Sequence, residues 1–174
     1  MLKFLPVLVA VVALLGGCSR AVEPQAVAEP TRWDPCSITP EQIEATGLDP
    51  EYRDVGWGEG IVVDDWDICS FKPVGFDVPY FFVVMSSLDR TIEEAREDSS
   101  NFSGHDFQVN GRDAFQYKTD IARSIIDCNV AVELPPGVVV FTINYNDVDD
   151  GIDPCPILLE HVGDLEAALP PATK

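Results

Sequence analysis

The stretch "RSIIDCNVAVELPPGVVVFTINYND", residues 123–147, contains two runs of β-branched and aromatic residues on either side of a Pro-Pro-Gly sequence. Such runs are typical of strands, and adjacent Pro and Gly residues are typical of a tight turn. Pro136 and Gly137 suit the two central positions of a type II turn, which favours Pro first and Gly second. The stretch therefore predicts a β-hairpin.

Further strands are predicted upstream of this hairpin. Asn110-Gly111 separates two β-prone runs within residues 105–118, and Asn-Gly is the strongest short signal for a two-residue hairpin turn. Two more strands are expected within residues 59–73 and over residues 79–88. The second of these is apolar on both faces, which predicts a position inside the sheet.

Two short helices are predicted from their first residues. Thr39 and Thr91 are each followed, three positions later, by a residue that completes a capping box, Gln42 in the first case and Glu94 in the second. In a capping box the Thr side chain and the later side chain each accept a backbone N–H, so both threonines are expected to be N-caps.

A third helix is predicted near the C-terminus, with Asp153 as its cap, Pro154 at its start and Pro170 at its end. Hairpins rather than helical crossovers join most of the predicted strands. We therefore expect an α+β fold with a mainly antiparallel β-sheet, flanked by short N-terminal, middle and C-terminal helices. The third helix has one apolar stripe, formed by Leu158, Val162, Leu165 and Leu169.

The composition is that of a globular protein with a strongly acidic surface. Hydrophobic residues make up 46% of the 174 residues and charged residues 24%, which separates the chain from disordered proteins. The 30 acidic residues outnumber the 11 basic ones, for a net charge of −19. Such a surface repels phosphate backbones and argues against nucleic acid as a partner. The sequence has no P-loop or dinucleotide fingerprint, so no cofactor is expected.

The first residues have the pattern of a lipoprotein signal peptide. Lys3 precedes the run Phe4–Leu15, which is apolar but shorter than the roughly 20 residues that span a bilayer. The "LGGC" sequence that ends at Cys18 resembles the bacterial lipobox, in which the cysteine thiol receives a diacylglyceryl group before cleavage. Two long acyl chains bind a protein stably to a membrane. We therefore expect lipid attachment at Cys18 and a location on the extracytoplasmic face of the cell membrane.

The domain organisation follows from this anchor and from the change in composition after it. Residues 1–17 are predicted to be the signal peptide, and residues 18–32 the lipidated cysteine and a flexible tether. Residues 33–170 are predicted to form a single globular α+β domain, and residues 171–174 a disordered tail.

Four cysteines remain in the predicted domain, an even number that indicates two disulfides on the oxidising side of a membrane. Zinc sites use closely spaced cysteines, whereas no two of these are nearer than 27 positions. Four cysteines allow three pairings, which sequence alone does not separate. We take Cys36–Cys69 and Cys128–Cys155 as the expected pairs. Each would close a loop of about 30 residues and stabilise the fold by about 3–4 kcal/mol.

Several motifs together resemble the actinobacterial family of small secreted lipoproteins known as domain of unknown function 3558. They are a "DPC" that opens the domain at Cys36, a cysteine followed two places later by an aromatic residue at Cys69 and Phe71, and a "DPC" at Cys155 that begins the last helix. Phe71 stands where the family usually has Trp. The resemblance covers about Trp33–Leu169 and implies a disulfide-linked envelope lipoprotein. The family has no established activity, so the resemblance implies no catalytic residue.

The two histidines do not form a recognisable catalytic pattern. His105 lies near Ser103 and Asp106, but sequence neighbours do not assemble a triad, and "NFSGHD" is not the nucleophile elbow of hydrolases. We expect His105 to be a loop residue. His161 lies beside Glu160, off the apolar stripe of the last helix, and is expected to be solvated.

Two acidic stretches are candidate ligand sites. Residues 146–153, "NDVDDGID", lack the ligand spacing of an EF-hand loop, and we interpret them as an acidic loop before the last helix. A calcium-binding loop with a looser ligand arrangement stays open as an alternative. Trp66, in "DDWD", is expected to pack in the core or at an edge rather than to stack on a ligand. No catalytic residue and no metal site are predicted.

These observations favour a membrane-anchored, non-enzymatic binding or interaction module that has an unknown envelope protein, glycan or lipid as its ligand. Two other hypotheses stay open. One is an envelope enzyme acting on wall polysaccharide or lipid through paired carboxylates. The other is a structural linker between membrane and wall.

Overall fold

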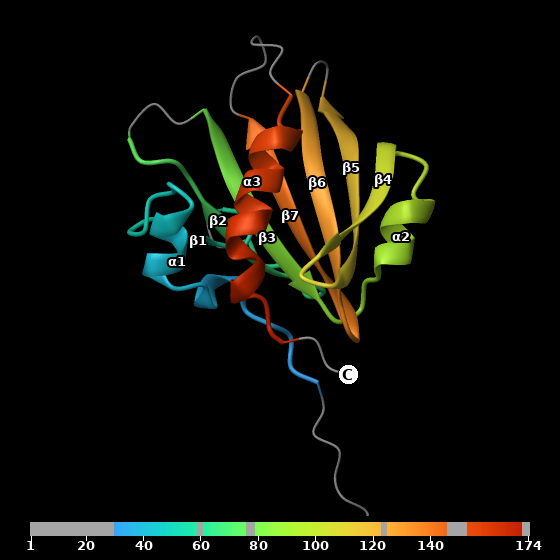
Figure 1. Ribbon diagram of the computed structural model, residues 1–174, viewed down its shortest axis with the longest axis horizontal. Helices are drawn as coiled ribbons and strands as arrows, with labels where there is room; N and C mark the ends of the chain where they lie inside the picture. The colour runs from blue at the N-terminus through green and yellow to red at the C-terminus, as the bar shows by residue number, and fades with distance from the viewer. Residues whose placement is uncertain (1–29, 59–60, 76–78, 123–124, 146–152, 172–174) are drawn as a thin grey trace, which may run out of the picture.

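The computed structural model describes residues 30–58, 61–75, 79–122, 125–145 and 153–171 (Figure 1). The strands are β1 (Asp54–Val55), β2 (Asp67–Phe71), β3 (Tyr80–Ser87), β4 (Phe102–Val109), β5 (Arg112–Ala122), β6 (Ile125–Leu134) and β7 (Gly137–Tyr145). The helices are α1 (Pro40–Ala45), α2 (Ile92–Glu97) and α3 (Cys155–Leu165), with 3₁₀ turns η1 (Pro35–Ser37) and η2 (Glu166–Ala168).

All seven strands belong to one antiparallel sheet in the order β1-β2-β3-β7-β6-β5-β4. The predicted α+β class and the mainly antiparallel sheet are therefore confirmed. β3 pairs with β2 on one side and with β7 on the other, which confirms its predicted place inside the sheet. The hairpin at Asn110-Gly111 is also confirmed. Both residues have the positive φ of a type I′ turn, 49° and 73°.

The β6–β7 hairpin is confirmed, but its turn is not the predicted type II turn. Leu134 pairs with Gly137, so Pro135 and Pro136 are the central residues, joined by a cis peptide bond. Gly137 is the first residue of β7, and a Cβ there would lie 1.8 Å from the carbonyl oxygen of Ser87. Close packing against the end of β3, rather than the turn, therefore requires this glycine.

The strand predicted within residues 59–73 is shorter in the structure. Only Asp67–Phe71 pairs with β3, whereas Ile61 and Val62 are exposed outside the sheet. The two-residue strand β1 was not predicted, because Asp54–Val55 has no alternating pattern. β-branched residues form strands only where a partner strand is available, and tertiary structure decides this.

The predicted helices are confirmed, together with both capping boxes at Thr39 and Thr91. α3 begins at Cys155, one residue later than expected, and its regular turns end at Leu165, before η2. The Asp153 carboxylate nevertheless accepts the backbone N–H of Cys155 at 3.1 Å. It therefore satisfies a free N–H of the first turn, as a capping residue does.

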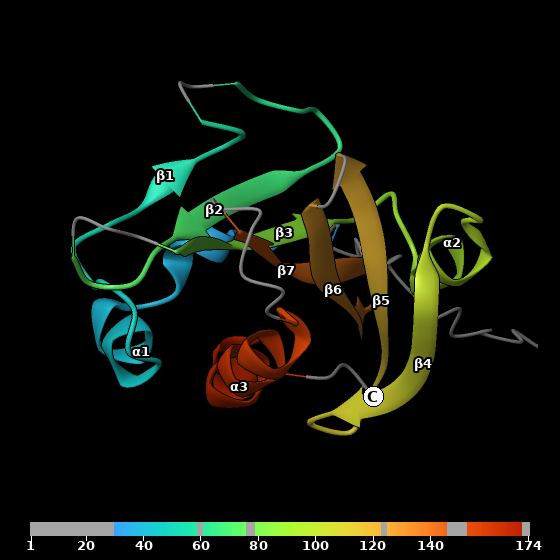
Figure 2. The same cartoon turned by 90° about the horizontal axis from the view of Figure 1, so that it is seen from above.

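The helices cover the two faces of the sheet unequally. α1 and α3 pack on one face over the main core, where Phe71, Phe82 and Phe141 are fully buried. α2 lies on the other side of β5 and β4 (Figure 2) and covers a second cluster around Val138 and Val140. The face that carries α2 is called the open face below, because no other described helix packs on it.

Candidate functional site

The four predicted disulfide cysteines pair as expected. Cys36–Cys69 joins η1 to β2, and Cys128–Cys155 joins β6 to the start of α3, each with a Cα–Cα distance of 5.2 Å. Both bonds lie on the face that carries α1 and α3. The predicted lipid-attachment residue, Cys18, is outside the described residues.

His105 is a strand residue rather than the predicted loop residue, because β4 begins before it, at Phe102. Ser103, His105 and Asp106 are all exposed. His105 pairs with Gln116 and Asp106 with Phe115, so the two side chains point to opposite faces of the sheet. Asp106 instead accepts a hydrogen bond from Arg96 at 2.8 Å.

The prediction of a solvated His161 is wrong. Its side chain is 5% exposed, and its Nε2 lies 2.9 Å from the hydroxyl oxygen of Tyr80. Burial lowers the pKa of His161, although Glu160 and Asp164 act in the opposite direction. α3 buries a wider arc than its apolar stripe, and Phe82 and Tyr80 of β3 fill the space around the imidazole.

The described residues contain no group of three or more His, Cys, Asp or Glu side chains placed to hold a metal ion. The acidic stretch 146–152 lies outside them. Within the same part of the chain, no helix is both long and apolar enough to cross a membrane.

Two hollows lie on the open face of the sheet. The first, of about 360 Å³, lies between α2 and strands β5, β6 and β7. The second, of about 310 Å³, lies over β2 and β3 beside the segment that follows β1. Val138 and Val140 line the first hollow and Asn144 lines the second, with Thr142 between them. Alternate residues of β7 share one face, so both hollows have the same strand in their floor.

A row of polar side chains crosses the sheet between the two hollows. Asn129 of β6 donates to the Thr119 hydroxyl at 3.0 Å and accepts from the Thr142 hydroxyl at 2.8 Å. One step along the strands, Asn144 donates to the Asp127 carboxylate at 2.5 Å. We call these five residues the polar row. Hydrogen bonds between strands hold its side chains in place.

Asp127 is the electrostatically unusual member of the polar row. It is 2% exposed, and its Oδ1 has no hydrogen-bond partner among the described residues. Burial raises its pKa to about 6, although the hydrogen bond from Asn144 acts in the opposite direction. The open face therefore holds one carboxyl group that changes charge near neutral pH.

Aromatic rings border both hollows. Trp66 and Tyr117 line the first hollow, and burial raises the pKa of Tyr117 to about 12, which keeps it a neutral hydroxyl. Trp66 packs against the second core cluster, as expected. Tyr52 and Trp57 line the second hollow, and Trp57 is 55% exposed. An exposed Trp beside ordered polar groups is typical of a ligand-binding surface.

Acidic residues dominate the charge around these hollows. Glu94 and Asp98 line the first and Asp54 the second. Arg90 also lines the first hollow, but Asp65 neutralises it in an ion pair of 3.0 Å. This distribution disfavours polyanions and permits neutral or cationic ligands.

Asp127→Asn is expected to raise the free energy of unfolding at pH 8 by about 1–2 kcal/mol and to change it little near pH 4. Between its ordinary pKa of 3.8 and the raised value near 6, the unfolded chain ionises before the folded one, so the wild type loses stability as pH rises. The full difference corresponds to at most about 3 kcal/mol, and solvent in the hollows screens part of it.

Urea denaturation of both chains from pH 4 to pH 8 measures this effect. Asp120→Asn, an exposed carboxyl on the neighbouring strand β5, is the matched control and should follow the wild type. Parallel curves for the wild type and Asp127→Asn would contradict the assignment.

The sequence interpretation did not identify the polar row. A signal was present in β6, where Asp127 and Asn129 alternate with Cys128 and Val130. Such alternation predicts a strand with one polar face. It did not predict that Thr119 and Thr142, from two other strands, would meet Asn129, because register is set by long-range pairing.

Comparison with known protein families shows which family the chain matches. A family model described as "Protein of unknown function (DUF3558)" matches residues 13–167, most of the chain. No curated protein and no solved structure matches it.

Proposed function

The chain belongs to the DUF3558 family of proteins of unknown function, and from this premise we propose that it is a non-enzymatic binding module of the cell envelope. It takes its ligand on the open face of the sheet. The acyl anchor at Cys18 holds it at the extracytoplasmic face of the cell membrane. The observation that carries the binding role is the pair of hollows that share β7 in their floor.

The shape of this surface supports binding of an extended ligand. The two hollows lie on one sheet face, and the polar row runs between them at the level of Thr142. Binding sites commonly combine a mainly apolar or aromatic lining with a few well-placed polar groups. Here Trp66 and Trp57 border the two ends, so one elongated ligand can contact both.

The chemistry of the surface favours a neutral, hydroxyl-rich ligand, and among envelope molecules this describes a glycan. The Asn and Thr side chains of the polar row both donate and accept hydrogen bonds, as sugar hydroxyls do. The acidic rim at Asp54, Glu94 and Asp98 repels anionic polymers. Exposed aromatic rings offer flat apolar contact area at low entropic cost.

Trp57→Ala is expected to weaken binding of chitotetraose, an uncharged glycan used here as a probe, by about tenfold to thirtyfold. The reason is that truncating a Trp that contacts the ligand commonly costs about 1.5–2 kcal/mol. Trp57 is half-exposed, so the substitution should leave folding stability within about 0.5 kcal/mol of the wild type. Isothermal titration calorimetry on the full chain carrying Cys18→Ala measures the affinity.

Leu159→Ala is the control for this experiment. Leu159 is also partly exposed, but it lies on α3, on the opposite side of the sheet. It should bind chitotetraose like the wild type. If chitotetraose does not bind, or binds Trp57→Ala with unchanged affinity, the glycan role of the open face is wrong.

A further inference from the structure

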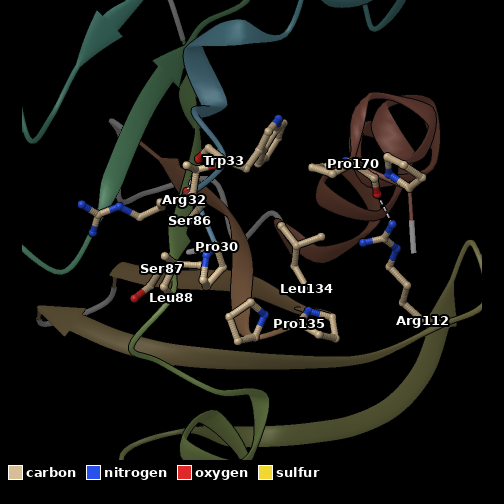
Figure 3. Close-up of a pocket in the computed structure, with 13 residues that line it drawn as sticks. Pro30, Arg32, Trp33, Ser86, Ser87, Leu88, Arg112, Leu134, Pro135 and Pro170 are labelled. Carbon is tan, nitrogen blue, oxygen red and sulfur yellow. Dashed lines mark hydrogen bonds between the residues drawn. The ribbon is translucent and has the colours of Figure 1, made fainter. Parts of the chain in front are cut away.

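A third pocket, of about 140 Å³, lies away from the open face, at the end of the molecule where the described chain begins and ends. Figure 3 shows its walls. They come from the N-terminal segment at Trp33, the end of β3, the β6–β7 turn at Leu134 and Pro135, and the C-terminal segment at Pro170. The lining is mostly apolar, and its polar members are Thr31, Ser86, Ser87 and the guanidinium groups of Arg32 and Arg112.

Arg112 is buried without an acidic partner in the part of the chain that the structure describes. Its side chain extends from the start of β5, where its Nη2 donates to the carbonyl oxygen of Pro170 (Figure 3). The residue is 6% exposed, and its Nε and Nη1 have no hydrogen-bond partner among the described residues. Burial lowers the pKa of Arg112, and no neighbouring carboxylate offsets that effect.

Among the described arginines, Arg112 and Arg53 have no ion pair, and Arg112 has two unpartnered nitrogen atoms where Arg53 has one. Arg32, Arg90 and Arg96 each form an ion pair with a carboxylate in the described structure. A buried guanidinium is unfavourable unless its charge and its N–H groups are satisfied. The acidic residues within the described ranges supply no such group at Arg112, so an added anion would complete the site.

We propose that this pocket binds a single oxyanion group, a carboxylate or a phosphate, carried on a small apolar stem. Arg112 is the anchor, because the fork of a guanidinium matches two oxygens of a carboxylate or phosphate. Leu134, Trp33 and the prolines contact the stem. A liquid water occupies about 30 Å³, so the pocket accommodates a head group and a short stem. The site is separate from the open face and does not depend on the proposed function.

Titration of the full chain carrying Cys18→Ala with sodium hexanoate and with inorganic phosphate tests the proposal. We expect both to bind, hexanoate more tightly because of its apolar stem, and both less tightly as sodium chloride is raised. Arg112→Met should weaken hexanoate binding by at least about tenfold. Arg53→Met is the matched control, because Arg53 also donates to a backbone carbonyl, that of Ile38, but lies outside the pocket.

The stability of Arg112→Met in urea, measured without ligand, distinguishes an arginine that binds an anion from an arginine that only stabilises the fold. If the Arg112 guanidinium is unpaired in the ligand-free protein, Arg112→Met removes an unpaired buried charge. The variant should then unfold at the same urea concentration as the wild type or at a higher one. If Arg112→Met is strongly destabilised, the variant does not test the anion site. The Nε–H NMR resonance of Arg112 in the otherwise unmodified chain then tests whether hexanoate binds there. A shift of that resonance with hexanoate supports the site, and no shift overturns it.

Vesicles distinguish the source of the anion. If an anionic lipid supplies it, the Cys18→Ala chain should bind phosphatidylglycerol vesicles but not phosphatidylcholine vesicles, and Arg112→Met should abolish that binding. If a soluble anion supplies it, only hexanoate or phosphate will bind in an Arg112-dependent way. The proposal is wrong if no probe binds the wild-type pocket, or if Arg112→Met binds all probes as well as the wild type does.

Discussion

A chain carrying Cys18→Ala is expected to leave the membrane fraction almost completely, while its disulfide-linked domain stays folded. Each buried methylene contributes about 0.8 kcal/mol to membrane binding, so two long acyl chains account for an effectively stable attachment. Cys18 lies outside the segment that begins at Pro30, so its loss should not disturb the sheet. Membrane fractionation measures the partition, and circular dichroism measures the fold.

Ser19→Ala is the control for the anchor, because it changes the next residue and leaves the thiol in place. It should remain in the membrane fraction. Mass spectrometry of the wild-type chain should find acyl groups on Cys18. If Cys18→Ala still sediments with membranes, the anchor proposal is contradicted.

The second large effect is expected for the paired substitution Cys128→Ala/Cys155→Ala, which should lower the free energy of unfolding by about 3–4 kcal/mol. The bond closes a loop with a sequence separation of 27, and in the chain-entropy model such a loop restricts the unfolded chain by about that amount. Both cysteines are also buried in the main core. Urea denaturation of the variant and the wild type measures the difference.

The paired substitution Cys36→Ala/Cys69→Ala is the comparison for this experiment, because it removes the disulfide that does not involve α3. This pair has a separation of 33, so a similar loss of global stability is expected. Hydrogen exchange should differ, because amides of α3 lose protection in the first variant and keep it in the second at low denaturant. An unchanged unfolding midpoint for Cys128→Ala/Cys155→Ala would contradict the assigned role.

Local chemistry explains which elements could be predicted from the sequence. The capping boxes at Thr39 and Thr91 and the turn at Asn110-Gly111 are encoded within a few residues, and all three are present in the structure. The disulfide pairing was one of three allowed choices. It is determined by the packing of η1 on β2 and of α3 on β6, which only the fold supplies.

Long-range contacts explain why the predictions for His161 and Gly137 were wrong. His161 was expected to be solvated because it lies beside Glu160 and off the apolar stripe of the last helix, whereas its hydrogen-bond partner Tyr80 is 81 positions away. Gly137 was assigned to a turn, although its constraint comes from Ser87 at the end of β3. The residues of the candidate sites could not be predicted from the sequence for the same reason. Nothing near Arg112 in the sequence shows that it lies beside Pro170.

The Cys36–Cys69 bond determines how the molecule bears mechanical tension. A force applied to the N-terminal segment acts first on the Arg32–Asp67 ion pair. The Cys36–Cys69 disulfide then transmits it to β2 and so to the sheet. α1, β1 and the exposed Trp57 lie inside the loop that this bond closes, and the force bypasses them. The rim of the second hollow therefore stays unstretched when the chain is pulled from its N-terminal end.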